Sequence, residues 1–171
     1  QGKYETFVQS KETSCYLYTM TQTDDLLRKL YDQLRNSGSS FSLVYFSDHG
    51  LAFKERGKDV QYLAHDDKYQ QNFQVPFMVI SSDDKAHRVI KARRSANDFL
   101  GFFSQWTGIK AKEINIKYPF ISEKKAGPIY ITNFQLQKVD YNHLGTDNFD
   151  PKPENKKIRP ERRIFYITEV I

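Results

Sequence analysis

The stretch that decides the fold is FSLVYFSDHG, residues 41–50. Its first six residues are mostly apolar, aromatic or β-branched, and turn-forming residues flank them, which predicts a mostly buried strand. Apolar residues before it recur on one helical face, which predicts a helix over 24–36 that Thr23 or Asp24 caps and Gly38 ends. The apolar stripe of this helix consists of Leu26, Leu27, Leu30, Tyr31 and Leu34. A helix that leads into a buried strand is the order found in α/β sheets.

The same pattern continues to about residue 109. A second buried strand is expected over 75–80, beside the strand at 41–46, and a long loop over 50–72 joins the two. The spacing of aromatic residues predicts a second helix, which begins at Ser95 and ends before Gly108. Further along, the sequence predicts short hairpin strands over 129–132 and 134–139, a loop over 145–160 and a last strand over 164–168.

Length and composition are those of one domain with a real core. We expect a single domain over 1–171, with a polar lead-in over 1–14, an α/β part over 15–109, and the hairpin with a basic tail over 110–171. Lys and Arg number 26 against 21 Asp and Glu, a mild basic excess. The single cysteine, Cys15, excludes an intrachain disulfide. No apolar run approaches the ~18 residues that cross a membrane. Because the chain begins with Gln1, it is expected to be a piece of a longer protein.

The residues with metal-binding chemistry are Asp48 and His49, which directly follow the predicted strand. In open α/β sheets, ligands bind at the carboxyl ends of strands. Adjacent side chains on a strand point to opposite faces, so both can reach one ion only if the chain turns, and Gly50 permits that turn. Carboxylate and imidazole suit zinc, and manganese less specifically. The alternative is an Asp-His-Gly turn without a metal.

These elements resemble those of a known superfamily. A strand followed by Ser47-Asp48-His49-Gly50, a loop that carries His65, and a strand that begins Val75-Pro76 are similar to the C-terminal signature of the sulfatase and alkaline phosphatase superfamily. The chain most resembles the bacterial phosphoethanolamine transferases, and the resemblance covers about residues 15–109. It departs from them at Leu17 and Tyr18, where that subfamily usually has Asp and Asn. The implied fold is the C-terminal part of an alkaline-phosphatase-like sandwich, with helices on a mostly parallel sheet.

The resemblance also implies roles for individual residues. Asp48 and His49 match paired zinc ligands, with manganese as the other candidate metal, and His65 matches a histidine that contacts the transferred phosphate or a second metal. The family's nucleophile is an upstream threonine near a further acidic ligand. Thr6 and Thr13 lie in a polar segment without that context, so the nucleophile is expected outside this chain. The chain alone is then expected to bind zinc weakly and to be inactive, and either to self-associate or to have its fold completed by a segment outside these residues.

The whole enzyme that the resemblance implies moves phosphoethanolamine from a phospholipid donor to lipid A or another envelope glycolipid acceptor, through a phospho-threonine intermediate. It works at the periplasmic face of the bacterial inner membrane and is anchored by helices outside these residues. Sulfatase and phosphoglycerol transferase chemistry remain alternatives within the superfamily.

A basic module that binds nucleic acid or another polyanion is a more distant alternative. It would use two basic clusters, one around His87 and one over 156–163. The aromatic residues fit core positions better, and no nucleic-acid motif is present, so no nucleic-acid partner is expected. His143 follows the predicted hairpin and has no assigned role.

Overall fold

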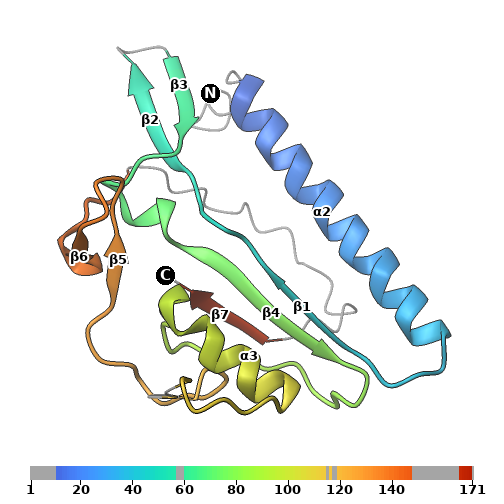
Figure 1. Cartoon of the computed structure of the whole chain (residues 1–171). Coiled ribbons are helices and arrows are strands. Elements are labelled where there is room, and N and C mark those ends of the chain that lie inside the picture. The colour runs from blue at the N-terminus through green and yellow to red at the C-terminus, as the bar shows by residue number, and fades with distance from the viewer. Residues whose placement is uncertain (1–10, 57–59, 115, 117–118, 148–165, 171) are drawn as a thin grey trace.

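A computed structural model describes residues 11–56, 60–114, 116, 119–147 and 166–170. Its main sheet has three strands in the order β1 (Ser42–Phe46), β4 (Val75–Ser81) and β7 (Tyr166–Val170), so β4 is the central strand (Figure 1). The strands expected at 41–46 and 75–80 are therefore confirmed as neighbours. The last strand, expected over 164–168, is confirmed over 166–168 and continues to 170, while 164 and 165 lie outside the described residues.

The orientation of the strands differs from the expected mostly parallel sheet. Every described strand pair is antiparallel, including β1 with β4, where Phe46 lies opposite Phe77, and β4 with β7. A parallel neighbour needs a crossover connection, usually a helix, that carries the chain back to the same end of the sheet. The connection from β1 to β4 instead contains a hairpin and a short 3-10 helix, η1 (Gln70–Asn72), so the chain returns along β1 in the opposite direction.

The prediction of a loop over 50–72 is wrong for most of that range. Strands β2 (Ala52–Arg56) and β3 (Val60–Ala64) form an antiparallel hairpin in which Ala52 lies opposite Ala64 and Lys54 opposite Tyr62. In Figure 1 this hairpin projects beyond the end of the main sheet, beside the start of α2. It begins two residues after Gly50 and ends directly before His65, so it holds together the two segments that carry the candidate site.

The first helix, α2 (Lys11–Asn36), is longer than predicted and runs along the side of β1 (Figure 1). Thr23 lies inside the helix and does not cap it, because its hydroxyl donates to the carbonyl of Thr19 at 2.9 Å. The expected end is confirmed, since Gly38 has a φ of 71°, the left-handed conformation that glycine adopts at helix ends. Leu27, Tyr31 and Leu34 are half-buried, whereas Leu26 is 56% exposed.

The second helix is confirmed as a 3-10 turn, η2 (Ala96–Asp98), that continues into α3 (Phe99–Thr107). The Ser95 hydroxyl caps it by accepting the Asn97 N–H at 3.3 Å. Gly108 ends it with a φ of 74°. Phe102 is buried and its ring lies 4.7 Å from that of Phe77, so α3 packs on one face of β4. The core of the sheet comprises Val75, Phe77, Val79, Phe102 and Phe120.

The hairpin of the C-terminal part is also confirmed, as β5 (Tyr130–Thr132) and β6 (Lys138–Asp140), followed by the 3-10 helix η3 (Tyr141–His143). The start of its second strand, expected at 134, is wrong, because residues 133–137 form the turn between the strands. Its buried residues form a second small core, which reaches Phe73 next to η1. The members are Ile129, Ile131 and Tyr141, with Phe73, Val139 and Leu144 packed against them. The predicted loop over 145–160 lies mostly outside the described residues.

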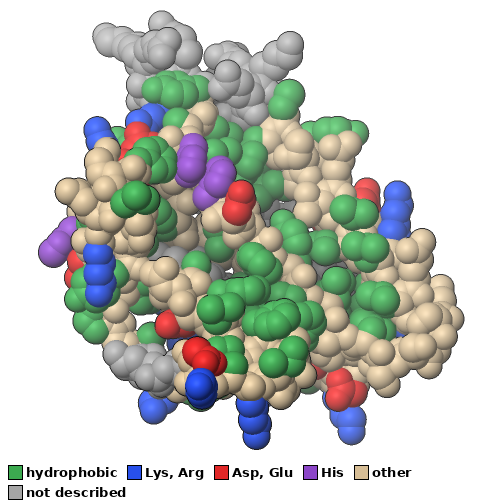
Figure 2. Space-filling model, in the orientation of Figure 1, with side chains coloured by type: hydrophobic (Ala, Val, Ile, Leu, Met, Phe, Trp, Pro, Cys, Tyr) green, Lys and Arg blue, Asp and Glu red, His purple; other side chains and the backbone are tan. Residues whose placement is uncertain are grey.

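The prediction that 41–46 is mostly buried is wrong for this chain. β1 is an outer strand of the described sheet, and the exposed fraction of Phe46 is 46%. Leu100, Phe103 and Trp106 on α3 are also exposed, at 65%, 38% and 36%. Figure 2 shows a large group of apolar side chains gathered on this face. Within the described residues, no helix is both long enough and apolar enough to span a bilayer.

Candidate functional site

Asp48 and His49 lie where β1 ends and the chain turns. The His49 N–H donates to the Asp48 carboxylate at 2.9 Å, and the Ser47 hydroxyl donates to the His49 carbonyl at 3.0 Å. These bonds fold the strand end into a tight turn, so the two side chains do not point to opposite faces. Asp48 Oδ2 and His49 Nε2 lie 3.9 Å apart. The convergence that the sequence predicted is therefore present.

A second contact orients the His49 ring. Its Nδ1 atom lies 2.8 Å from the carbonyl oxygen of Gly50, and a carbonyl can only accept, so Nδ1 is the protonated nitrogen. Nε2 then has a lone pair, and this atom is the one near Asp48. Metal-binding histidines commonly donate their other ring N–H to a backbone carbonyl or carboxylate, which fixes the tautomer. His49 has this arrangement.

The Asp48 side chain is 88% exposed and therefore accessible to solvent and ions. The hydrogen bond from the His49 backbone N–H holds the pKa of the Asp48 carboxyl below its ordinary value. Asp48 is therefore an anion at neutral pH. An anionic carboxylate beside an imidazole lone pair is a donor set that suits zinc.

Gly50 is required here by a close approach of two backbone segments. Its N–H donates to the carbonyl of Asn72 at 2.7 Å. A Cβ atom at this position would lie 2.2 Å from the carbonyl oxygen of Gln71 and 3.0 Å from that of Gln74. The sequence analysis assigned Gly50 to the turn, but the structure shows that contact with the η1 segment excludes a side chain.

His65 directly follows β3 and lies against His49. The two imidazole rings are stacked, with centroids 3.9 Å apart and planes at 14°, and the Phe134 ring meets His65 edge-on at 4.9 Å. In-plane lone pairs of two nearly parallel rings cannot point at one ion. In this arrangement His65 is therefore not a ligand of the same ion as His49, but it remains free to contact a bound phosphate. Figure 2 shows histidine side chains next to each other on the apolar face.

Asn72 links the two histidine-bearing segments, and the sequence analysis missed it. Its side chain is fully buried, its backbone carbonyl accepts from Gly50, and its Oδ1 accepts from the Asp66 N–H at 3.0 Å. Gly50 follows His49 and Asp66 follows His65. Asn72 therefore fixes the position of one histidine relative to the other.

The pair of Lys54 and Asp66 was missed as well. Lys54 Nζ donates to the Asp66 carboxylate across the base of the β2–β3 hairpin, and Lys68 N–H donates to the same carboxylate at 2.9 Å. Burial, the largest single influence, raises the pKa of the Asp66 carboxyl, but the hydrogen bonds from Lys54 and from the Lys68 N–H, together with the charges of both lysines, outweigh it, so the pKa lies below its ordinary value. The same hydrogen bond raises the pKa of Lys54. The pair holds the residue after His65 against β2.

The described residues offer two candidate metal ligands and do not complete a metal site. Among them, no group of three or more His, Cys, Asp or Glu side chains could hold an ion. A catalytic zinc site usually has three protein ligands and an open position. Asp48 and His49 fit two of these ligands by donor type, tautomer and charge.

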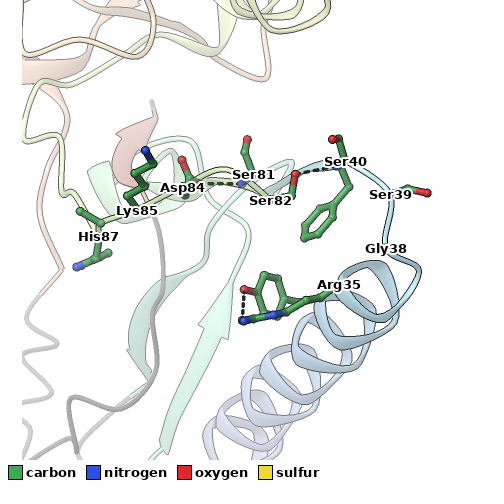
Figure 3. Close-up of a pocket in the computed structure, with 12 residues that line it drawn as sticks. Arg35, Gly38, Ser39, Ser40, Ser81, Ser82, Asp84, Lys85 and His87 are labelled. Atoms are coloured by element: carbon green, nitrogen blue, oxygen red, sulfur yellow. Dashed lines mark hydrogen bonds between the residues drawn. The ribbon is translucent and has the colours of Figure 1, made fainter.

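A larger cavity of about 460 Å³ lies at the other end of β1 and β4, away from Asp48 and His49. Figure 3 shows that it is enclosed by the end of α2 and the segments around Ser40 and Ser82. Arg35 at its wall donates to the Tyr31 hydroxyl at 3.2 Å. Asp48, His49 and His65 do not line it, whereas Lys85 and His87 of the first basic cluster do.

Comparison with known proteins decides the family. The sulfatase family profile matches residues 1–109. The chain belongs to the sulfatase family. It is 99% identical over 153 residues to "Phosphoethanolamine transferase OpgE" of Escherichia coli (strain K12), a match that covers 90% of this chain and 29% of that protein. It is 36% identical over 53 residues to the "Putative phosphoethanolamine transferase" of Haemophilus influenzae, over 29% of this chain and 11% of that protein.

The chain thus spans less than a third of the length of either relative. No solved structure matches it. The superfamily that the sequence motifs resemble is confirmed, and both relatives have the name of the subfamily that those motifs resemble most.

Proposed function

We propose that this chain is part of a metal-dependent phosphoethanolamine transferase and supplies one side of its active site. The observation that supports this most strongly is the 99% identity to a relative with that name, over 90% of the chain. The local geometry agrees, because a strand end presents Asp48 and His49 side by side, with Oδ2 and Nε2 3.9 Å apart.

Asp48 and His49 would hold zinc, or manganese as the second choice. When bound, the metal would lower the pKa of a coordinated hydroxyl and polarise a phosphoryl oxygen. Asp48 contributes the negative charge, and the Gly50 carbonyl keeps the His49 ring in the tautomer that leaves Nε2 available. No other described residue is proposed as a ligand.

His65 would contact the phosphoryl group that is transferred. Stacking on His49 places it beside the proposed metal ligands, and the Phe134 ring limits its rotation on the other side. A neutral His65 can donate a hydrogen bond to a phosphoryl oxygen, and a protonated His65 adds charge stabilisation.

The remaining parts of the reaction lie outside the described residues. We propose that the hydroxyl oxygen of a threonine from another part of the enzyme attacks the phosphorus of phosphatidylethanolamine, the bond to diacylglycerol breaks, and diacylglycerol leaves with a proton. The phospho-threonine intermediate then carries the intact phosphoethanolamine group on the threonine oxygen. Lipid A or another envelope glycolipid would then accept the phosphoethanolamine. The enzyme would work at the periplasmic face of the inner membrane, anchored by membrane-spanning helices, none of which is found among the described residues.

The test uses the complete Escherichia coli transferase that the chain matches, with residues numbered as here. Release of fluorescent diacylglycerol from a labelled phosphatidylethanolamine measures the first half-reaction. We expect Asp48→Asn and His49→Ala to lower the rate by about a hundredfold or more, since each removes a ligand of the metal that stabilises the transition state. The control His143→Ala changes an exposed histidine of η3 and should leave the rate unchanged.

Parallel reactions separate the alternatives within the family. Release from phosphatidylglycerol, or hydrolysis of an aryl sulfate, in preference to release from phosphatidylethanolamine would contradict the proposed substrate. Undiminished release by Asp48→Asn would contradict the proposed metal site.

A further inference from the structure

A second concave site borders the small core, because Ile129 and Tyr141 both line it. The cavity has a volume of about 280 Å³, and Asp48, His49 and His65 are not among the residues that line it. Three basic side chains line it, those of Lys91, Arg93 and Lys125. Among the described lining residues there is no Asp or Glu. The others are Ala92, Ala126, Gly127, Pro128, Ile129, Tyr141 and Asn142.

The order of residues in segment 90–94 turns two of the cations toward the cavity. Ile90, Ala92 and Arg94 are buried, at 6%, 6% and 1% exposure, whereas Lys91 and Arg93 between them are exposed. This alternation is that of an extended chain, in which residues two apart share a face and lie about 6–7 Å from each other. Lys91 and Arg93 therefore lie on the same side, and Lys125 comes from a separate segment.

Buried Arg94 fixes these two segments to each other. Its Nε donates to the Phe120 carbonyl at 2.8 Å, and its Nη2 donates to the Ser122 hydroxyl at 3.1 Å. Its Nη1 donates to the carbonyl of Arg93 at 2.9 Å. The segment that carries Lys91 and Arg93 is thereby hydrogen-bonded to the segment that leads to Lys125. The backbone segments that carry the cations are thus held relative to each other without a ligand, and preorganisation of this kind favours binding.

The ring of Tyr141 orients the guanidinium group of Arg93. The guanidinium carbon of Arg93 lies 5.4 Å from the centre of the Tyr141 ring, a cation–π distance. Tyr141 is itself held, because it is 1% exposed and its hydroxyl accepts from Gln74 Nε2 at 2.6 Å. The nearest acidic neighbour in sequence, Asp140, already accepts both the backbone and side-chain N–H groups of Asn142, at 2.8 and 3.1 Å.

Three positive charges around one cavity repel each other, and neither Lys91 nor Lys125 forms an ion pair with another described residue. An anion in the cavity would remove that repulsion. Phosphate esters carry about −1.5 to −2 charges at neutral pH, and the planar fork of an arginine matches their oxygens in pairs. We propose that this cavity binds the phosphate group of a phosphate ester, at a site separate from the proposed transfer site.

The test is titration of the complete, ¹⁵N-labelled chain with inorganic phosphate. The amide signals of Ala92, Ala126 and Gly127 should shift in a saturable way. The variant Lys91→Gln/Lys125→Gln should bind about tenfold more weakly, as expected for the loss of two exposed charge contacts. The control Lys29→Gln/Lys110→Gln removes the same charge from exposed positions elsewhere and should bind as the unaltered chain does. Lys91→Arg/Lys125→Arg keeps the charges and should retain binding, which separates loss of the site from loss of folding.

Vesicles distinguish the two sources of such a group. If the site accepts lipid phosphates, the chain should co-sediment with vesicles that contain phosphatidylglycerol and not with pure phosphatidylcholine, and the Lys91→Gln/Lys125→Gln variant should lose this binding. Response to inorganic phosphate alone would assign the site to soluble phosphate esters. Absence of saturable shifts at these amides, or equal weakening by the control pair, would overturn the proposal.

Discussion

Replacement of Gly50 by alanine tests the contact that positions the Asp48–His49 turn. The added Cβ would lie 2.2 Å from the Gln71 carbonyl oxygen. This oxygen belongs to the backbone of Gln71, which cannot rotate away as a flexible side chain can. Overpacking that forces the backbone to shift destabilises a fold by about 1–3 kcal/mol. Loss of the hydrogen bond from Gly50 to Asn72 adds about 0.5–1.5 kcal/mol, so the free energy of unfolding should fall by about 2–4 kcal/mol.

Thermal unfolding followed by circular dichroism measures this loss, which corresponds to a lower Tm by about 5–15 °C for a domain of this size. The matched control is Gly101→Ala in α3, where the nearest atom, Ile116 Cγ1, would lie 3.7 Å from the new Cβ, an ordinary contact. Alanine inside a helix is favoured over glycine by about 0.5–1 kcal/mol, so this control should be neutral or stabilising. Equal stability of Gly50→Ala and the unaltered chain would refute the close-approach argument.

Three further predictions concern the same region and the exposed sheet edge. Asn72→Leu leaves the buried Asp66 N–H without its acceptor, so urea titration should show a loss of about 1–3 kcal/mol, and the ring-current shifts between His49 and His65 should disappear from the NMR spectrum. The folded state lowers the pKa of Asp66, so ionised Asp66 stabilises the fold above the ordinary pKa of 3.8, and this contribution is lost as pH falls through the lower folded pKa. The folded state raises the pKa of Lys54, so charged Lys54 stabilises the fold below pH 10.5, and this contribution is lost as pH rises through the raised pKa. Asp66→Asn should therefore remove about 1–2 kcal/mol near neutral pH and little at either extreme; a constant difference across pH would contradict the ion pair. The chain should also self-associate in analytical ultracentrifugation, because β1 is an outer strand and its last residue, Phe46, is exposed, and Phe46→Lys should reduce this self-association without unfolding the chain.

Local patterns in the sequence were sufficient for the elements with a strong period. The apolar runs of β1 and β4, the aromatic spacing of α3 and the Gly-Pro break before β5 each depend on residues within one segment. The predicted convergence of Asp48 and His49 was of the same kind, since the turn is made by hydrogen bonds among residues 47–50.

Features that depend on distant contacts were missed. In the β2–β3 hairpin, charged residues interrupt the apolar pattern, and its strands are held by long-range bonds, such as Lys54 to Asp66 and the Phe53 N–H to Asp147 at 2.6 Å. Phe134 reaches His65 only because its own N–H donates to Asp67, at 2.7 Å, across the chain. The antiparallel orientation of β1 and β4 likewise follows from the path of the connection between them, and the sequence of neither strand indicates it.

The early start of α2 has a different cause. Residues 11–23 lack an apolar stripe, so periodicity gave no sign of a helix there. Hydroxyl groups within this part bond back to carbonyls of the preceding turn, as Thr19 does to Tyr16 at 2.7 Å and Thr21 to Leu17 at 3.3 Å. Polar side chains that satisfy themselves in this way allow a helix that hydrophobic patterning does not predict.

Zinc titration of the chain with ¹⁵N-labelled histidines tests the central claim most directly, because it asks whether Asp48 and His49 bind metal at all. Nε2 of His49 should shift, with weak affinity because the described chain offers two ligands and not three, while the exposed His87 and His143 should stay unchanged. Asp48→Asn should abolish the His49 shift, and His65→Ala should leave it in place, since His65 cannot share the ion in the stacked arrangement. A His49 signal that does not respond to zinc, or a response that persists in Asp48→Asn, would contradict the account.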